Sequence, residues 1–289
     1  MSKILRKHWI EIILCLILLT GVGLILYPTV SDRWNAVHQT RAIASYVENV
    51  ESTSGENRQA LLDHANTYNE KLAGVRTDFE LNKEEETEYL SQLDVSGTGI
   101  MGYIEIPSIH VNLPIYHGVE AGTLQAGVGH IPGSSLPVGG SSTHCVLSGH
   151  RGLPSARLFT DLDQMEEGDV FMLHVLDETL TYQVDQIRIV LPEESEELAI
   201  VNGKDYCTLI TCTPYGVNTH RILVRGDRIE NVSEDMITTK EAVRIAPSIV
   251  GLAVGLPLMI IVLAGVLIYR QVKKPKRDEK EILEDLRNR

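Results

Sequence analysis

The chain has 289 residues, 43% of them hydrophobic, and a formal net charge of −13. The negative charge argues against nucleic-acid binding, because a phosphate backbone is bound by a concentrated basic surface. The apolar content is high enough for a buried core and argues against an intrinsically disordered chain.

Both ends of the sequence have the composition of membrane spans. The only charged residue from Trp9 to Tyr27 is Glu11, and residues 245–269 contain no charge. A helix from Trp9 to Tyr27 would be about 27 Å long, which is close to the thickness of a bilayer's hydrocarbon core. The sequence therefore predicts two transmembrane helices, at residues 9–29 and 245–269.

Basic residues next to these spans predict their orientation. Positive flanks stay on the cytoplasmic side, so we expect both termini, 1–8 and 270–289, in the cytoplasm and the central part of the chain outside. A cleaved signal peptide is the alternative for the first span, but no small-x-small site directly follows it, because Ala42-Ile43-Ala44 comes too late. We expect an uncleaved anchor. The flanking basic residues are Lys3, Arg6, Lys7, Arg270, Lys273, Lys274, Lys276 and Arg277.

The segment 30–96 is predicted to be helical and to pack on a following domain. Apolar residues recur there every three or four positions, and Ser52 to Gly55 interrupts the pattern. Asn82 and Glu85 form an N-cap pair at the start of a third helix. The residues expected to share a face are Trp34, Val37, Arg41, Ala44, Val47 and Val50 in the first helix, and Leu61, Ala65, Tyr68 and Leu72 in the second.

Short strand-like runs take over after Gly97. Many short strands with Gly and Pro between them predict a β-sandwich or a closed β-barrel over residues 97–230, followed by a linker at 231–244. The Gly/Ser/Pro-rich stretch 118–142 is expected to be a long irregular loop. The runs are residues 103–106, 111–116, 145–147, 170–176, 180–191, 206–211 and 221–224.

Of the four cysteines, Cys212 is the candidate nucleophile. Cys15 lies in the first span, and Cys145 and Cys207 lie in strand-like runs, where they are expected to be buried thiols or, alternatively, a disulfide. No pair of Cys or His residues has the spacing of metal ligands, so no metal site is expected. Cys212 ends a strand immediately before the turn Thr213-Pro214-Tyr215-Gly216, where a cleft can reach its thiol.

A reactive thiol needs electropositive neighbours, and two residues qualify. Arg221 lies nine residues after Cys212, so a strand, a turn and a returning strand can bring the two side by side. His150, in Ser148-Gly149-His150, is the second. Taken alone, each is more simply a surface arginine or a loop histidine.

The stretch Thr208-Leu209-Ile210-Thr211-Cys212, with Arg221, resembles the TLxTC…R signature of the sortases, the surface transpeptidases of Gram-positive bacteria. The run Cys-Thr-Pro-Tyr-Gly-x-Asn-Thr-His-Arg is especially specific to class C, the pilus-assembling sortases, and the similarity extends over residues 27–230. Further stretches that resemble class C blocks are Gly102 to Pro107, Leu113 to Gly118, Gly133 to Gly140 and Ser148 to Pro154.

This resemblance implies a mainly β fold, an eight-stranded closed barrel with N-terminal helices and two flanking transmembrane helices. It assigns the catalytic roles to His150, Cys212 and Arg221 and implies no cofactor. The Cys212 thiolate would attack the Thr–Gly carbonyl of an LPxTG-like sorting signal, and Arg221 would stabilise the oxyanion. His150 would protonate the leaving amine and later deprotonate the incoming one. Four further histidines, His117, His130, His144 and His220, are expected to be structural.

One family feature is altered in this sequence. Many class C sortases carry an Asp-Pro-aromatic lid before the barrel, and here the corresponding segment Arg76 to Leu81 has no proline. Asp78 and Phe79 are either a shortened lid, which would pair with Arg221 and shield Cys212, or an ordinary loop.

The expected activity is transfer of an acyl group from a pilin or surface protein with an LPxTG-like signal to an amine, a pilin lysine. A housekeeping-like sortase would use the amine of the peptidoglycan crossbridge instead, and a hydrolytic cysteine peptidase would use water. A doubly anchored adhesin or pilus scaffold would need no reactive thiol. The partners expected are thus the sorting-signal proteins, the acceptor amine and the membrane.

Overall fold

The computed structural model describes residues 3–73 and 79–231, together with isolated positions between 255 and 287. Residues 30–242 form one compact unit, and residues 1–29 and 243–289 are grouped in another. Asp78 lies outside the described residues. So do the linker 231–244, the second span 245–269 and the tail 270–289, apart from residue 231 and the isolated positions.

Helix α1 (Lys3–Ser52) contains the first predicted span. It is long and apolar enough to cross a membrane, from Ile12 onward, and the apolar window is not buried by other parts of the protein. Among the described residues this is the one helix with that property.

The second half of α1 packs on the barrel by a face that is partly polar. Tyr46 is 1% exposed; its hydroxyl donates to the Met101 carbonyl oxygen at 3.0 Å and accepts from the Leu176 N–H at 2.7 Å. The predicted face is wrong for its first half, because Trp34 is 67% and Val37 49% exposed. The packing side there is polar instead, because Asn35 Nδ2 donates to the Ser155 carbonyl oxygen and Gln39 Nε2 to the Ala126 carbonyl oxygen. The spacing of apolar residues does not reveal such contacts.

The next two helices follow the predicted pattern. Helix α2 (Gly55–Leu72) buries Ala65, Tyr68 and Leu72, and helix α3 (Lys83–Leu90) begins with the predicted cap. Asn82 Oδ1 accepts from the Glu85 N–H at 3.0 Å, and Glu85 Oε2 accepts from the Asn82 N–H at 2.8 Å. This reciprocal pair satisfies two N–H groups that a helix start would otherwise leave free.

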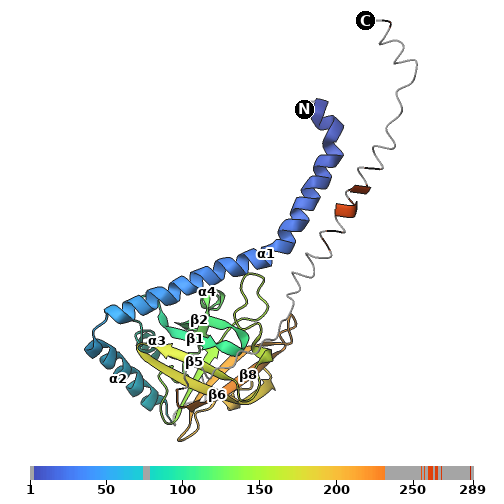
Figure 1. The fold of residues 1–289 in the computed structure, drawn as a ribbon. Helices are drawn as coiled ribbons and strands as arrows, with labels where there is room; N and C mark the ends of the chain where they lie inside the picture. The colour runs from blue at the N-terminus through green and yellow to red at the C-terminus, as the bar shows by residue number, and fades with distance from the viewer. Residues whose placement is uncertain are drawn as a thin grey trace. The chain divides into compact units, whose positions relative to one another are not determined.

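The strands form a barrel beneath the second half of helix α1 (Figure 1). Their order is β1-β2-β3-β4-β7-β8-β6-β5, and β5 pairs back to β1. The pairs β2–β3 and β4–β7 are parallel and the others are antiparallel. The predicted mainly β, eight-stranded closed barrel is confirmed. The strands are β1 (Ile100–Ile106), β2 (Val111–His117), β3 (Val128–His130), β4 (Thr143–Ser148), β5 (Val170–Val175), β6 (Glu178–Val190), β7 (Asp205–Thr213) and β8 (His220–Ile229).

The stretch predicted as an irregular loop, 118–142, holds the short helix α4 (Ala121–Ala126) and strand β3. A strand of three residues is too short to show an alternating pattern in the sequence. Other short helices are η1 (Pro107–Ile109), η2 (Leu162–Gln164) and η3 (Glu196–Leu198), the last within the β6–β7 connection.

Two apolar clusters lie on opposite faces of strands β4, β7 and β8. Leu147, Leu209 and Val224 belong to the main core inside the barrel. Their sequence neighbours point the other way, because side chains alternate along a strand. We call this second group the outer cluster; it comprises Val146, Val190, Leu198, Ile210 and Leu223, with Phe79 and Ile131 packed against it.

Candidate active site

Cys212 and Arg221 face each other across the β7–β8 hairpin. They are directly paired in the antiparallel register, followed by Thr213 and His220. The turn between them is closed by hydrogen bonds from the Val217 and Asn218 N–H groups to the Pro214 carbonyl oxygen, at 3.0 and 2.9 Å. The adjacency predicted from the nine-residue spacing is therefore present.

His150 reaches the same end of the barrel from strand β4. The parallel register of β4 and β7 runs to the pair Ser148 and Ile210. It continues one step further, because Gly149 N–H donates to the Ile210 carbonyl oxygen at 3.0 Å and Thr211 Oγ1 donates to the Gly149 carbonyl oxygen at 2.7 Å. His150 and Cys212 each lie two residues past the pair Ser148 and Ile210, so they lie side by side at the ends of neighbouring strands.

The four cysteines are free, and Cys212 differs from the others of the barrel in its exposure. Cys145 and Cys207 are paired in register and are only 2% and 0% exposed, whereas Cys212 is half-buried. The alternative of a disulfide between the first two is not observed. Burial raises the pKa of the Cys207 thiol well above its usual value, so this group keeps its proton. Cys212 is the barrel thiol that a substrate can reach.

The hydrogen bonds of the Arg221 guanidinium to described residues involve only its Nη1 atom. Nη1 donates to the carbonyl oxygens of Asn218 at 3.3 Å and of His220 at 3.0 Å. Among the described residues no carboxylate forms an ion pair with it. A cation held next to a thiol with unused N–H groups can bind an oxygen that becomes negative during acyl transfer.

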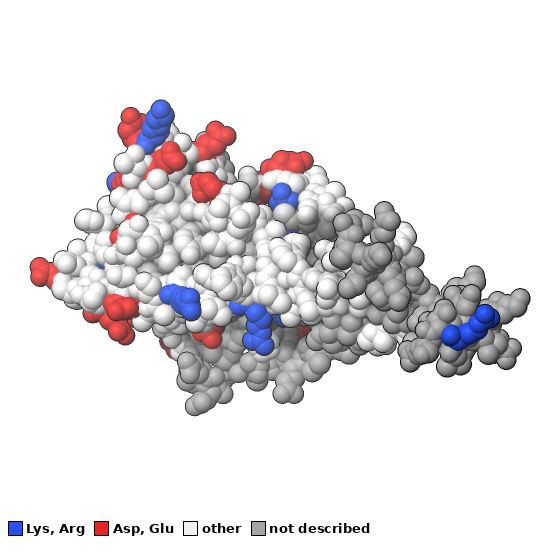
Figure 2. Space-filling model, turned by 90° about the horizontal axis from the view of Figure 1, so that it is seen from above, with Lys and Arg blue, Asp and Glu red and all other residues white. Residues whose placement is uncertain are grey.

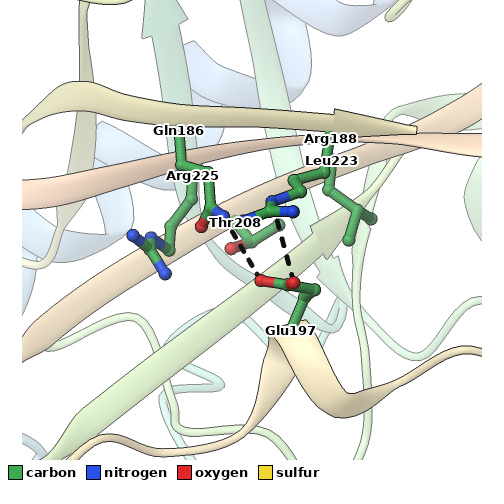
Figure 3. Close-up of a pocket in the computed structure, with 6 residues that line it drawn as sticks. All are labelled: Gln186, Arg188, Glu197, Thr208, Leu223 and Arg225. Atoms are coloured by element: carbon green, nitrogen blue, oxygen red, sulfur yellow. Dashed lines mark hydrogen bonds and ion pairs between the residues drawn. The ribbon is translucent and has the colours of Figure 1, made fainter. Parts of the chain in front are cut away.

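The outer face of strands β7, β8 and β6 continues from this pair in cross-strand rows. The row Cys212–Arg221–Val190 is followed by Ile210–Leu223–Arg188 and then by Thr208–Arg225–Gln186. The β6–β7 connection lies over the far rows: Glu197 pairs with Arg188 at 3.7 Å and accepts from Gln186 Nε2 at 3.4 Å (Figure 3). The thiol and guanidinium thus lie at one end of a surface whose next row holds the apolar pair Ile210 and Leu223 and whose far row is polar.

A cavity of about 80 Å³ borders this surface on the side of the β6–β7 connection. Apolar side chains and polar groups from two loops and strand β4 line it, including Phe79, Ser134, His144, Leu198 and Ile200. On the face drawn in Figure 2, acidic and basic side chains are dispersed among uncharged ones, and the described residues show no continuous basic surface there.

A sortase-domain family model matches residues 104–229, which include all three candidate residues. Sortase C1 from Streptococcus agalactiae is 50% identical, with a TM-score of 0.65, and the match covers 66% of this chain and 100% of that one. Sortase C-1 from Actinomyces oris is 46% identical, with a TM-score of 0.56, over 61% of this chain and 99% of that one. The chain belongs to class C of the sortase family.

Other relatives agree with this membership. Clostridium perfringens sortase C, solved with the C-terminal cell wall sorting motif, is 44% identical, with a TM-score of 0.59, over 66% of this sortase and 100% of that chain. Sortase D of Bacillus subtilis is 31% identical over 131 residues, which is 44% of this chain and 63% of that protein. The sortase therefore spans slightly less than two thirds of that curated relative's length.

Of Asp78 and Phe79, the structure describes only Phe79, and it packs against the outer cluster. Two members of that cluster, Ile210 and Leu223, lie two residues from Cys212 and Arg221 on the same strand faces. Phe79 thus packs on a cluster that also includes the two neighbours of the thiol and guanidinium rows, Ile210 and Leu223.

The buried histidines of the sortase are engaged through both ring nitrogens. His144 Nδ1 donates to the Ala199 carbonyl oxygen at 2.9 Å, and Nε2 accepts from Thr208 Oγ1 at 2.7 Å. Burial lowers the pKa of His144 to about 4 and also lowers that of His117. His117 contacts the Gly99 and Gln92 carbonyl oxygens, and His130 contacts Tyr89 and Ser135. These contacts support the structural role expected for them.

The sequence did not single out the apolar surface next to Cys212. The sequence does contain a signal for it, because Ile210 and Leu223 lie two residues from Cys212 and Arg221 on the same strand faces, and Val190 is paired with Arg221. The closed topology is what shows that these residues face away from the main core.

Proposed function

We propose that this sortase cleaves an LPxTG-like sorting signal between Thr and Gly and transfers the Thr carbonyl to a lysine side chain of a pilin. The observation that carries the proposal is the convergence of a half-buried thiol, a guanidinium and an imidazole on three adjacent strand ends, at residues Cys212, Arg221 and His150. The catalytic domain is proposed to lie outside the cell, anchored by the first span and by residues 245–269.

The first half-reaction forms a thioester. The Cys212 thiolate attacks the Thr carbonyl carbon, the C–N bond to Gly breaks, and His150 gives its proton to the leaving amine. Arg221 would bind the carbonyl oxygen while it carries negative charge. The outer cluster next to Cys212 supplies an apolar surface for the Leu and Pro of the signal.

The second half-reaction consumes the thioester. The lysine amine attacks the same carbon, its proton passes to His150, and the C–S bond breaks to return the thiolate. An unperturbed lysine has a pKa near 10.4 and is mostly charged at neutral pH, so a base is needed at this step. The crystal structure of Streptococcus pneumoniae sortase C, which is 41% identical to this chain, bears on pilin substrate specificity, and this likeness supports a pilin as the partner.

Asp78 and Phe79 are proposed to act as a shortened lid. Phe79 packs on the outer cluster, which is the surface proposed to receive the sorting signal. A signal that binds there would have to displace the Phe79 ring, so the lid would compete with substrate.

The proposal is tested with an LPxTG peptide and three acceptors: a pilin domain, the crossbridge peptide and water alone. We expect cleavage between Thr and Gly and transfer to the pilin lysine at the highest rate. Cys212→Ala should abolish cleavage, whereas the matched variant Cys207→Ala should retain it. Preferred transfer to the crossbridge amine would indicate a housekeeping-like enzyme, release of the free acid a peptidase, and no cleavage at all a non-enzymatic scaffold.

A further inference from the structure

Arg151, the residue after His150, has an almost completely buried guanidinium. Its side chain is only 8% exposed. Nη2 pairs with Asp163 Oδ2 at 2.5 Å, and Nη1 donates to Thr213 Oγ1 at 3.2 Å. Thr213 directly follows Cys212, so one side chain spans from the residue after the histidine to the residue after the thiol.

The β7–β8 turn also packs on this loop. The guanidinium carbon of Arg151 lies 5.8 Å from the centre of the Tyr215 ring. Gly152 has a φ of +76°, and a Cβ atom there would lie 3.1 Å from Tyr215 Cε2. The ring therefore rests against the backbone just after Arg151, in a place that a larger residue would disturb.

The other side of the loop is held by Phe159. Its N–H donates to the His150 carbonyl oxygen at 3.1 Å. A Cβ atom at Gly149 would lie 2.6 Å from Phe159 Cδ2, so only glycine allows this approach. The backbone on both sides of His150 is thus fixed, by Phe159 on one side and by Arg151 with Tyr215 on the other.

Burying this guanidinium is not an efficient way to stabilise the fold. Removing a charge from water costs several kcal/mol, and a buried ion pair often only balances that cost. Arg151 Nε is buried and has no hydrogen-bond partner among the described residues, which adds to the penalty. An apolar side chain of similar size would fill the space at lower cost, so fold stability alone does not account for a guanidinium at this position.

We propose that Arg151 is a positioning residue for acyl transfer, which holds the loop of His150 at a fixed distance from the strand of Cys212. This inference rests on the proposed function of those two residues. The planar guanidinium reaches Asp163 and Thr213 at once from a rigid fork, which a lysine ammonium cannot do. His150 must give a proton to the leaving amine and take one from the incoming amine, and both amines are bonded to the same carbonyl carbon. A displacement of the His150 ring by about 1 Å can lower the rate roughly 100-fold.

The test compares Arg151→Gln with Arg157→Gln in the full-length protein. Arg157 lies on the same loop, pairs with Asp161 and is 69% exposed, so it controls for loss of a loop arginine. For Arg151→Gln we expect kcat to fall roughly 10- to 100-fold with KM changed less than about 3-fold, because the substrate surface is untouched. Arg151→Lys should not restore the rate, and Arg157→Gln should resemble the unaltered protein.

A second measurement asks whether Arg151 acts through His150. The rate of Cys212 alkylation by iodoacetamide is compared with and without Arg151→Gln, in the unaltered protein and in a His150→Ala background. We expect Arg151→Gln to slow alkylation several-fold in the first background and to have no further effect in the second. An equal slowing in both backgrounds would mean a general structural defect and would overturn the positioning role.

The outcomes separate this inference from the proposed function. If His150→Ala retained peptide cleavage, the proposed role of His150 would be wrong. If His150→Ala abolished cleavage while Arg151→Gln matched Arg157→Gln, only the positioning role would be wrong. Should Arg151→Gln fail to fold, Thr213→Val removes the Nη1 acceptor alone; we expect a smaller fall in kcat at constant KM, and an unaltered kcat would contradict the inference.

Discussion

Asn35 Nδ2, on helix α1, donates to the Ser155 carbonyl oxygen at 2.7 Å, which joins residues 120 apart in sequence. One turn earlier, Asp32 Oδ1 accepts from the Arg157 N–H at 2.8 Å. Both partners lie on the β4–β5 loop, which also contains His150. The N-terminal helix therefore holds the outer part of the loop whose inner part lies beside Cys212.

The first prediction follows from these two bonds. The double variant Asp32→Ala, Asn35→Ala should lower kcat for peptide cleavage by about 3- to 10-fold, because the loop loses two of its anchors and His150 is less well placed. The control is Gln39→Ala on the same helix, whose side chain donates instead to the Ala126 carbonyl oxygen. Equal kinetics for the double variant and the control would show that helix α1 does not influence the loop.

The second prediction concerns Arg221. Arg221→Lys keeps the positive charge but loses the planar fork, and removal of one oxyanion donor typically costs about 100- to 1,000-fold in turnover. We expect a loss of that size in kcat for cleavage of an LPxTG peptide, with normal thermal melting. A Lys variant with a near-normal rate would leave Arg221 with a structural role only.

The third prediction concerns the lid. Phe79→Ala, alone or with Asp78→Ala, should uncover the outer cluster and speed labelling of Cys212 by a bulky thiol reagent, without loss of the fold. Leu90→Ala serves as the control, because Leu90 is a 49% exposed apolar residue of helix α3. Identical labelling rates in all variants would remove the lid from the mechanism and leave the catalytic residues as proposed.

The fourth prediction concerns pH. Burial lowers the pKa of His144 to about 4, from an ordinary value near 6.5, so the unfolded chain binds a proton at this site between those values and the folded protein does not. Stability is therefore complete above about pH 6.5 and falls as the pH drops towards 4, by roughly 3 kcal/mol from this residue.

Urea unfolding of the solubilised full-length protein at several pH values measures that slope. His144→Gln should flatten it between pH 4 and 6.5, although the variant is less stable at neutral pH because the bond to Ala199 or Thr208 is impaired. The same substitution at the exposed His38 should not flatten it. A slope that is unchanged in His144→Gln would contradict the assignment.

The parts of the site that the sequence predicts are those set by local spacing. The nine residues from Cys212 to Arg221 contain a turn and bring the two into register, and the cap of helix α3 needs only Asn82 and Glu85. Both depend on neighbours along the chain, so a pattern of residue types is enough to find them.

Contacts between distant segments could not be predicted in this way. Arg151 meets Thr213 62 residues away, and Asn35 meets Ser155 120 residues away, and both bonds involve polar groups that carry no periodic signal. For the same reason the apolar spacing predicts a packed face that includes Trp34 and Val37, although polar side chains of α1 make the contacts and these two residues are exposed.

The central claim, acyl transfer through Cys212 to a pilin lysine, is tested most directly by mass spectrometry of the full-length enzyme incubated with two forms of a pilin that carries an LPxTG signal. With the unaltered pilin we predict a product in which the Thr carbonyl is joined to a lysine Nζ of the next subunit. With a lysine-free pilin we predict a thioester that accumulates on Cys212 and no polymer. Polymers formed from the lysine-free pilin, or an acyl group found on any residue other than Cys212, would contradict the account.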